Sequence, residues 1–269
     1  MPNPIFLAHR SIISVTGADA EPFLNNILTA STLGVAEGEL RYGALLTPQG
    51  KIIADLFFTR QGDAILVECG AQAAPAVAKR LTMMKLRAPV AIGQRSDLGV
   101  SVFEGMADPR DAAAPKRSFG PAGPAGDPGG YHAARIAAGL AEQGADFASE
   151  EVFPADINMD LLGGVDFKKG CFVGQEVVSR MKRRGTARRR TLRVTVPVGS
   201  VPSPILANGF EIGMLTSISG GAGLARVRID RLAEAQAKNE AITVDGRPVT
   251  FDTPAWLAED LAAMAGAKA

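Results

Sequence analysis

The chain of 269 residues is 46% hydrophobic, and its 29 lysines and arginines nearly balance 28 aspartates and glutamates, leaving a net charge of +1. This length and apolar content suffice for two or three compact units or one large one. The balanced charge argues against a uniformly basic nucleic-acid-binding protein, although a local basic patch stays open.

Cysteine and histidine are scarce. The chain has two cysteines, Cys69 and Cys171, and two histidines, His9 and His132. Their wide separation gives neither a disulfide framework nor the ligand spacing of a zinc site. Two thiols also cannot supply the four ligands of a self-contained iron–sulfur cluster. We therefore expect a reducing compartment and no resident metal.

The N-terminal residues and the hydropathy bear on localisation. Residues 1–10 show neither the apolar core of a signal peptide nor an arginine- and serine-rich transit pattern. No apolar run approaches the roughly 20 residues that span a bilayer. These features predict a soluble cytoplasmic protein without membrane contact.

The first elements read as strand, turn and helix. Ser11–Val15 is a short β-branched run, and Asp19 can cap a helix that places Phe23, Leu24 and Ile27 on one face. Further strands and one helix follow. The expected strands are Arg41–Thr47, Lys51–Arg60, Ala64–Cys69, Arg87–Ile92 and Leu98–Phe103, and the expected helix is Ala73–Leu86. This mixture predicts an α+β sheet domain.

The second half of the chain changes character twice. Residues 107–130 are rich in Ala, Pro and Gly and read as a long loop or domain crossing. Residues 133–143 return to a helical pattern. From Thr191 onward, short alternating runs such as Ile242–Val244 and glycine turns predict a small C-terminal β-barrel.

Cys171 is the first residue that could carry chemistry. It follows Lys168, Lys169 and Gly170, and the residues after it, through Ser179, can form a helix. A thiol at a helix N-terminus beside two cations is expected to have a lowered pKa and more thiolate. The alternative is a small buried hydrophobe, which is the commonest role of a free cysteine.

Asp55 is the second such residue. It interrupts the apolar run Ile52–Phe58, and strand alternation places it on the same face as Ile53 and Phe57. A carboxylate among such neighbours needs a partner or a ligand, such as an amine or a pterin nitrogen. The alternative is an edge position or a structural hydrogen bond to a backbone amide.

The third feature is a basic run between Arg180 and Arg193. It holds eight cations: Arg180, Lys182, Arg183, Arg184, Arg188, Arg189, Arg190 and Arg193. Such a run can contact phosphates, RNA or the polyglutamate tail of a folate. No aromatic residue interleaves it, so base stacking is unsupported. A solvated face with paired surface charges is the competing interpretation.

Several of these segments together resemble one family. Residues Lys169–Glu176 read KGCFVGQE and resemble the K-G-C-[FY]-x-G-Q-E signature of the YgfZ family, which is related to the aminomethyltransferase (T-protein) of glycine cleavage. Other matching segments are Val15–Asp19, Ala44–Ile52, Asp108–Arg110, Asn158–Gly164 and Arg180–Gly185. The resemblance spans residues 5 to about 230.

The resemblance implies a three-domain, T-protein-like ring of α+β class. A split N-terminal folate-binding-type domain would comprise residues 1–40 and 105–185, an inserted ferredoxin-like α+β domain residues 41–104, and a C-terminal β-barrel residues 186–269. Tetrahydrofolate or a derivative would sit in the central opening. Members are linked to the maintenance of iron–sulfur enzymes and, through one of these, to tRNA thiomethylation. A mitochondrial relative assists late iron–sulfur assembly.

The resemblance also implies two sets of site residues. The motif supplies Cys171 as the essential thiol, accompanied by Lys169, Gln175 and Glu176. The folate set contains Asp55, Tyr131, Arg135 and Asn158, in which Asp55 faces the folate amine and Tyr131 stands where some members have a tryptophan. The sequence departs from the T-protein at Ala137, which replaces a folate-contacting glutamate and removes a hydrogen-bond acceptor.

Three functions therefore compete. The first is a folate-binding accessory protein for iron–sulfur assembly or repair, with client enzymes or assembly proteins as partners, a folate pocket and Cys171 as the essential thiol. The second is a folate-dependent aminomethyltransferase of the T-protein type, which Ala137 and Cys171 argue against. The third is a tRNA-binding module that uses the run Arg180–Arg193. Whether the chain is an enzyme at all stays open.

Overall fold

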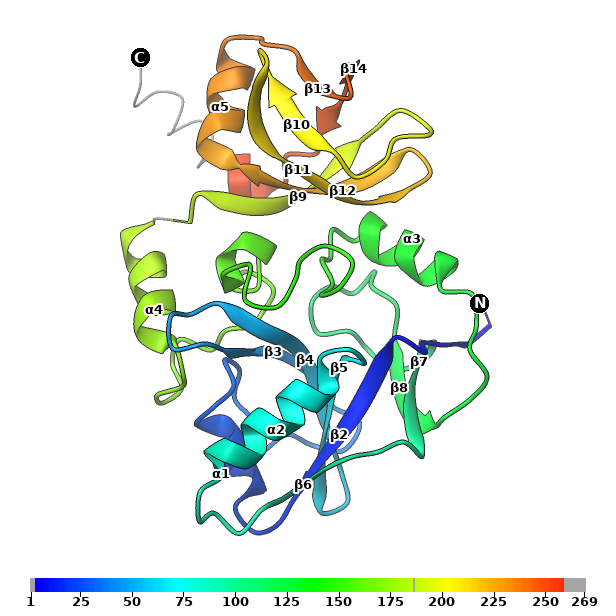
Figure 1. The fold of residues 1–269 in the computed structure, drawn as a ribbon, viewed down its shortest axis with the longest axis vertical. Helices are drawn as coiled ribbons and strands as arrows, with labels where there is room; N and C mark the ends of the chain where they lie inside the picture. The colour runs from blue at the N-terminus through cyan, green and yellow to red at the C-terminus, as the bar shows by residue number, and fades with distance from the viewer. Residues whose placement is uncertain (1–2, 186, 259–269) are drawn as a thin grey trace.

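The computed structural model describes residues 3–185 and 187–258. It has two tiers (Figure 1). The larger tier is formed by the chain up to α4, and the smaller by the strands and helix that follow. No helix in these described ranges is long and apolar enough to cross a membrane.

A five-stranded antiparallel sheet organises the larger tier, with strand order β3-β4-β5-β2-β6. Its strands are β2 (Arg10–Thr16), β3 (Arg41–Leu46), β4 (Ile52–Gln61), β5 (Ala64–Gly70) and β6 (Ala91–Gln94). The predicted strands and the observed ones agree closely, except that β6 begins four residues later than Arg87. The turns at residues 47–51 and 61–64 connect the central hairpins.

Both faces of this sheet are covered. Helices α1 (Ala20–Asn25) and α2 (Ala74–Met84) pack on one face around Leu24, Phe58 and Val77. The other face is covered by residues 141–178, which enclose Tyr42 and Phe57 among others. Double coverage explains why β4 reads as a nearly continuous apolar run instead of a clean alternation.

A second, three-stranded sheet with order β1-β7-β8 lies beside the first. Its strands are β1 (Ile5–Phe6), β7 (Leu98–Met106) and β8 (Arg117–Pro121). The expectation of a loop throughout residues 107–130 is therefore wrong at β8. The sequence Arg117–Pro121 has no apolar alternation, and its strand forms because β7 offers a partner edge.

Helix α3 (Gly129–Ala137) and the 3-10 turn η1 (Pro154–Ile157) pack against strands of the smaller tier, and α4 (Gln175–Arg184) precedes that tier in the chain. The helix expected over residues 133–143 instead starts at Gly129 and ends at Ala137. The left-handed backbone at Gly139, with φ of 75°, turns the chain just after it.

The smaller tier is a seven-stranded antiparallel sheet with order β14-β13-β10-β11-β12-β9-β15. Its elements are β9 (Arg189–Thr195), β10 (Pro204–Ala207), β11 (Phe210–Ser219), β12 (Ala222–Arg228), α5 (Ile229–Ala237), β13 (Ile242–Val244), β14 (Arg247–Pro248) and β15 (Thr250–Phe251). The edge strands β14 and β15 are separated by Val249 alone, so the sheet nearly closes on itself. The predicted small β-barrel and the α+β class are confirmed.

The domain bounds given in the sequence analysis stay a prediction. Strand β2 comes from the expected segment 1–40, yet it pairs with β5 and β6 of the expected segment 41–104. Residues on the two sides of position 40 therefore share one sheet and one core.

Candidate functional site around the cysteine motif

Cys171 lies exposed in the loop that precedes α4. The helix starts at Gln175 behind Gly174, whose φ of 80° is left-handed, so Cys171 is four residues before the first helical residue. The expectation of a thiol at the helix N-terminus is wrong, because the left-handed glycine delays the helix. The alternative of a buried, hydrophobe-like cysteine describes Cys69, which is fully buried, and not Cys171.

Lys169 anchors this loop. Its ammonium Nζ donates to the carbonyl oxygens of Asn25, Leu28 and Ala30 at 2.5, 2.6 and 3.2 Å. An ammonium has three protons, so these bonds use its full donor capacity. Burial lowers the pKa of Lys169 to about 8, although the nearby negative charge of Asp166 acts to raise it. Lys168, the residue before the motif, is exposed.

Backbone bonds hold the other side of the loop. The Asp166 carboxylate Oδ1 accepts from the amides of Lys168 and Lys169 at 2.8 and 3.1 Å. The Asp166 amide in turn donates to the carbonyl of Thr29 at 2.9 Å, and the Thr29 hydroxyl donates to the carbonyl of Gly164 at 2.6 Å. The loop that presents Cys171 is thus fixed at its base.

Two segments that the sequence analysis singled out separately touch each other here. A Cβ atom on Gly174 would lie 2.7 Å from the carbonyl oxygen of Thr47 and 3.0 Å from Cα of Gly50. Only glycine tolerates both this approach and the left-handed backbone. The turn between β3 and β4 therefore packs directly against the start of α4, with Val177 over Gly50.

Gln175 and Glu176 open α4. Glu176 is exposed and pairs with Arg180 one turn later. A carboxylate in the first turn is favourable beside the positive end of the helix. Both residues line an open groove that Lys182 and Arg183 border from the other side. The motif residues Lys169, Cys171, Gln175 and Glu176 thus divide into one inward-facing anchor and three residues at or near the surface.

The folate set lies elsewhere, beginning with Asp55 in β4. A bulge sets Ala54 opposite Leu45 and Ile52 opposite Leu46, so Ile53 is the extra residue and packs with the opposite core from Phe57. The predicted shared face of Ile53, Asp55 and Phe57 is therefore wrong for Ile53. Asp55 is 1% exposed, and burial raises its pKa against the attraction of Arg10, whose Nη1 is 3.9 Å from Oδ1.

Asp55 belongs to a buried network of charges that sequence reasoning missed. Glu68 Oε1 accepts from Arg10 Nε at 2.8 Å and from Arg117 Nη1 at 2.6 Å. Arg117 Nη2 donates to the Tyr131 hydroxyl at 2.8 Å, and that hydroxyl donates to Glu142. Burial raises the pKa of Tyr131 to about 12, so the phenol stays protonated.

Aromatic rings flank the same network. The guanidinium carbon of Arg117 lies 4.2 Å from the ring centroid of Phe57, and that of Arg110 lies 4.6 Å from it. Arg110 also stacks 5.0 Å from Tyr42 and binds both carboxylate oxygens of Asp108. In the sequence, the only indication of this part of the network was the resemblance of Asp108–Arg110 to the YgfZ family.

Arg135 and Asn158 join the two tiers. Arg135 Nη1 donates to Asp146 at 2.6 Å, and its Nη2 donates to the hydroxyl of Ser217 in β11 at 2.9 Å. Asn158, held at a left-handed φ of 61°, donates to the carbonyl of Thr191 in β9 at 2.6 Å. The structure therefore brings Asp55 and Tyr131 into one network and gives Arg135 and Asn158 separate places.

These four side chains do not fit tetrahydrofolate in the arrangement described. Each is at most 6% exposed, and the Tyr131 hydroxyl and the Arg135 guanidinium are occupied by internal hydrogen bonds. Some buried atoms have no hydrogen-bond partner, namely Arg10 Nη1 and Nη2, Asp55 Oδ1, Glu68 Oε2 and Arg117 Nε. These atoms are buried among the chain's own side chains.

The basic run is divided by its contacts. Arg190 forms a two-bonded pair with Asp160, and Arg193 pairs with Asp252 and donates to the carbonyl of Ala137. Lys182, Arg183 and Arg184 on α4 are exposed and have no carboxylate partner within the described residues. Only part of Arg180–Arg193 is therefore a free basic surface.

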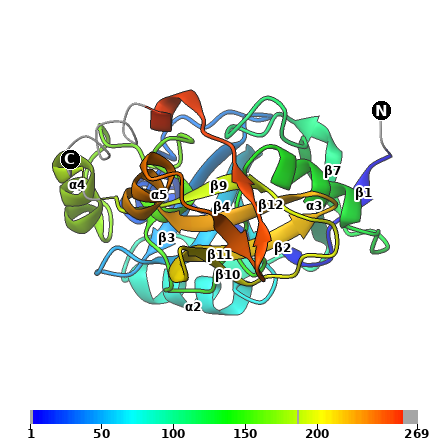
Figure 2. The same ribbon diagram turned by 90° about the horizontal axis from the view of Figure 1, so that it is seen from above.

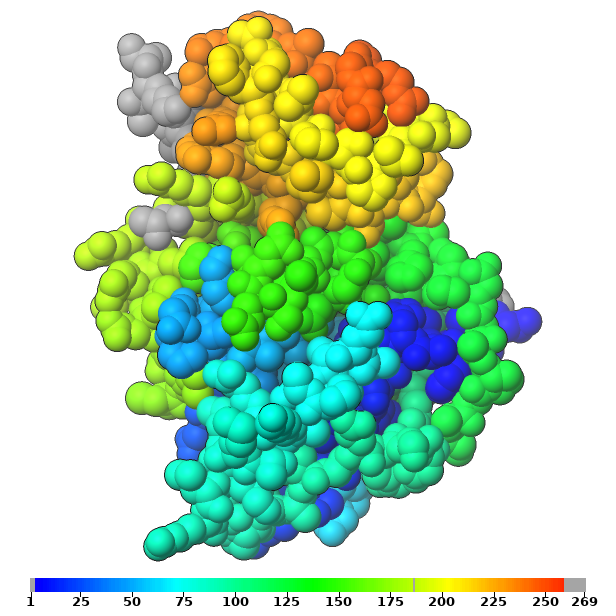
Figure 3. Space-filling model, in the orientation of Figure 1, coloured from blue at the N-terminus to red at the C-terminus, as the bar shows by residue number. Residues whose placement is uncertain are grey.

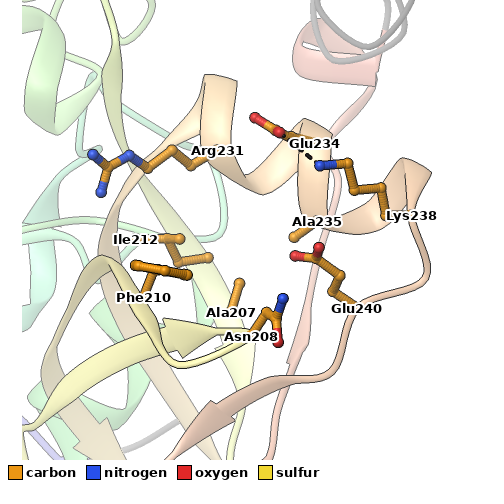
Figure 4. A pocket seen from close by; sticks show the side chains of 9 residues that line it. All are labelled: Ala207, Asn208, Phe210, Ile212, Arg231, Glu234, Ala235, Lys238 and Glu240. Atoms are coloured by element: carbon orange, nitrogen blue, oxygen red, sulfur yellow. Dashed lines mark hydrogen bonds and ion pairs between the residues drawn. The ribbon is translucent and has the colours of Figure 1, made fainter. Parts of the chain in front are cut away.

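A separate cavity of about 350 Å³ lies in the smaller tier between the β10–β11 turn and α5 (Figure 4). Ala207, Ile212 and Ala235 form its buried wall, and the exposed Phe210 stands at its mouth. It contains no residue of the cysteine motif. In the part of the chain that the structure describes, no group of three His, Cys, Asp or Glu side chains could hold a metal ion.

Two family models match parts of the chain, one in each tier. Residues 7–99 match the family model described as the GCVT N-terminal domain, and residues 188–259 match the one described as the CAF17 C-terminal beta-barrel domain. A crystal structure of the glycine cleavage system aminomethyltransferase T from Bartonella henselae superposes with a TM-score of 0.75 at 16% identity, covering 93% of this chain and 84% of that one. The chain has the aminomethyltransferase fold. The predicted T-protein-like architecture is confirmed at the level of fold.

Curated relatives add names. The chain is 28% identical to the iron-sulfur cluster assembly factor IBA57, mitochondrial, of Mus musculus, over 83% of this chain and 76% of the mouse protein. It is 29% identical to the IBA57 homolog of Pyricularia oryzae over 69% of this chain, and it spans 55% of that relative's length. The homolog of Phaeosphaeria nodorum is 26% identical, over 97% of this chain and 81% of the relative.

The cytoplasmic localisation expected from the sequence is contradicted by these names, because all three relatives are described as mitochondrial. The expectation rested on residues 1–10 lacking a signal or transit pattern. Such a local absence does not determine the compartment in which the rest of the chain works.

Proposed function

We propose that this chain is a YgfZ-type accessory protein for the assembly or repair of iron–sulfur clusters, and that Cys171 is its working thiol. The observation that carries the proposal is the exposed Cys171 on a loop fixed by Lys169 and Asp166. The names of the relatives support the same role.

A single thiol limits the mechanism. An iron–sulfur cluster takes four protein ligands, and Cys69 is buried in the core, so Cys171 contributes one sulfur at most. The cluster is therefore the cargo of a shared site, in which a partner protein supplies the remaining ligands. The fixed loop presents the sulfur to that partner without the entropy cost of ordering a flexible segment.

The finer expectations follow from this role. Support for tRNA thiomethylation is indirect and passes through an iron–sulfur enzyme. Folate has no part in the proposed step, since Asp55 and Tyr131 are closed off. The chain shares its fold with an aminomethyltransferase, but the site gives no support for aminomethyl transfer, because Ala137 replaces the folate-contacting glutamate of the T-protein.

Complementation tests the proposal. A strain deleted for its own relative of this chain receives the wild-type gene, Cys171→Ser or the matched control Cys69→Ser, and the activities of its iron–sulfur enzymes are assayed. We expect wild type and Cys69→Ser to restore the enzymes and Cys171→Ser to fail at equal protein level. Full restoration by Cys171→Ser eliminates the thiol role.

A further inference from the structure

Helix α4 is an external helix with a one-sided charge. Of its ten residues only Val178 is buried. Lys182, Arg183 and Arg184 crowd its last turn, whereas its one acidic residue, Glu176, is already paired with Arg180. In Figures 1 and 2 the helix stands at one edge of the molecule, away from α3 and from the centre of the C-terminal sheet.

An apolar cleft of about 220 Å³ runs along the inner side of α4. Leu161, Phe167, Val178 and Met181 line it, and Leu161 is 47% exposed although it is a large aliphatic residue. A space-filling view shows this edge of the molecule beside the C-terminal tier (Figure 3). An exposed apolar cleft with a polar rim is typical of a binding site.

The cleft continues toward the cysteine motif. The Lys182 ammonium lies 3.7 Å from the ring centroid of Phe167, and these two residues separate the cleft from the open groove lined by Gln175 and Arg183. Phe167 and Gln175 flank Cys171 in the chain. A partner that reaches the Cys171 sulfur therefore meets the groove and the basic end of α4 next.

We infer that the α4 surface, meaning Leu161, Phe167, Met181, Lys182, Arg183 and Arg184, binds an acidic segment of a partner protein that inserts an aliphatic side chain into the cleft. Charge complementarity selects the acidic residues, and the aliphatic wall selects the anchor. The inference rests on the proposed function, because it supplies the docking contact of the partner that shares the cluster at Cys171.

Protein fits this surface better than RNA does. Bases bind through open aromatic faces, and the Lys182 ammonium already occupies a face of the Phe167 ring. Leu161, Val178 and Met181 give the cleft an apolar wall, and the other charged residues that line it, Asp160 and Arg190, are paired with each other. A nucleic acid would use the arginines and leave the cleft unfilled, so RNA serves as an alternative outcome of the test.

Fluorescence anisotropy with the full chain tests the inference. The probe is a labelled peptide of aspartate and glutamate with two leucines one helical turn apart. Its comparison peptide has alanines in place of the leucines. We expect the Arg183→Glu/Arg184→Glu variant to weaken binding at least about tenfold, and Leu161→Ala to weaken it about threefold. Phe210→Ala, which changes an exposed residue on the other tier, leaves binding unchanged.

The results distinguish a failure of the docking inference from a failure of the proposed function. Equal affinity of the two peptides, insensitivity to Arg183→Glu/Arg184→Glu, or tighter binding of a transfer RNA than of the acidic peptide would each overturn the inference. Peptide binding that follows the pattern above while Cys171→Ser still complements leaves the docking surface standing and removes the proposed function. If complementation requires Cys171 but tolerates Arg183→Glu/Arg184→Glu, the proposed function stands and the docking surface is removed.

Discussion

Replacement of Lys169 by methionine removes the ammonium that joins the motif loop to residues 25–30, while the length of the side chain is kept. A hydrogen bond to a charged group contributes about 1.5–3 kcal/mol, and the half-buried position of Lys169 places its bonds at the low end, so the three together reach about 4.5 kcal/mol. Burying the charge offsets part of this, and the expected net loss is about 1–3 kcal/mol.

Urea unfolding followed by circular dichroism gives the loss in unfolding free energy, and hydrogen exchange locates it. We expect Lys169→Met to increase exchange at the amides of residues 25–30 and 166–173. The matched control is Lys168→Met, because Lys168 is exposed and has no side-chain partner in the described part of the chain. Equal unfolding free energies for the two variants, within about 0.5 kcal/mol, would refute the reasoning.

The same pair of proteins gives a pH test. Burial lowers the pKa of Lys169 to about 8 in the folded chain, below its ordinary value of 10.5. Between pH 8 and pH 10.5 the unfolded state binds more protons at Lys169 than the folded state does. The contribution of Lys169 to the unfolding free energy therefore rises with pH. The difference in unfolding free energy between wild type and Lys169→Met is expected to widen from pH 8 to pH 10, and a narrowing would contradict the lowered pKa.

Two further predictions concern the buried charges. Glu68→Gln leaves Arg10 and Arg117 with less opposing charge, and thermal unfolding is expected to show a loss of about 3–5 kcal/mol, with the exposed Glu150→Gln as control. Arg135→Lys cannot bridge Asp146 and Ser217 at once, so calorimetry is expected to resolve unfolding of the C-terminal tier at a lower temperature than the rest; a single unshifted transition would contradict this.

Local patterns predicted most of the fold. The runs Arg41–Thr47, Lys51–Arg60 and Ala64–Cys69 were found as strands because they are largely apolar and the turn residues between them mark their ends. Strand β8 escaped, since its pairing with β7 is a tertiary contact. The later start of α4 escaped as well, because the left-handed conformation of Gly174 is imposed by the turn at Gly50.

The candidate site divides in the same way. The sequence placed Cys171 either at a helix N-terminus or in the core, and its exposed position in a loop before the helix was not predicted. The inward role of Lys169 does not, because its partners lie more than 130 residues earlier in the chain. The network of Arg10, Glu68 and Arg117 was equally hidden, since each residue reads as an ordinary surface charge until the sheets bring them together.

The covered second face of the five-stranded sheet has a consequence for synthesis. Tyr42, Ile52 and Phe57 emerge from the ribosome early, whereas the residues that cover them, such as Phe147, Met159 and Phe172, are made much later. A nascent chain that ends shortly after residue 104 has all five strands and a bare apolar face. A premature stop between residues 104 and 178 therefore leaves an aggregation-prone sheet in place of a smaller working protein.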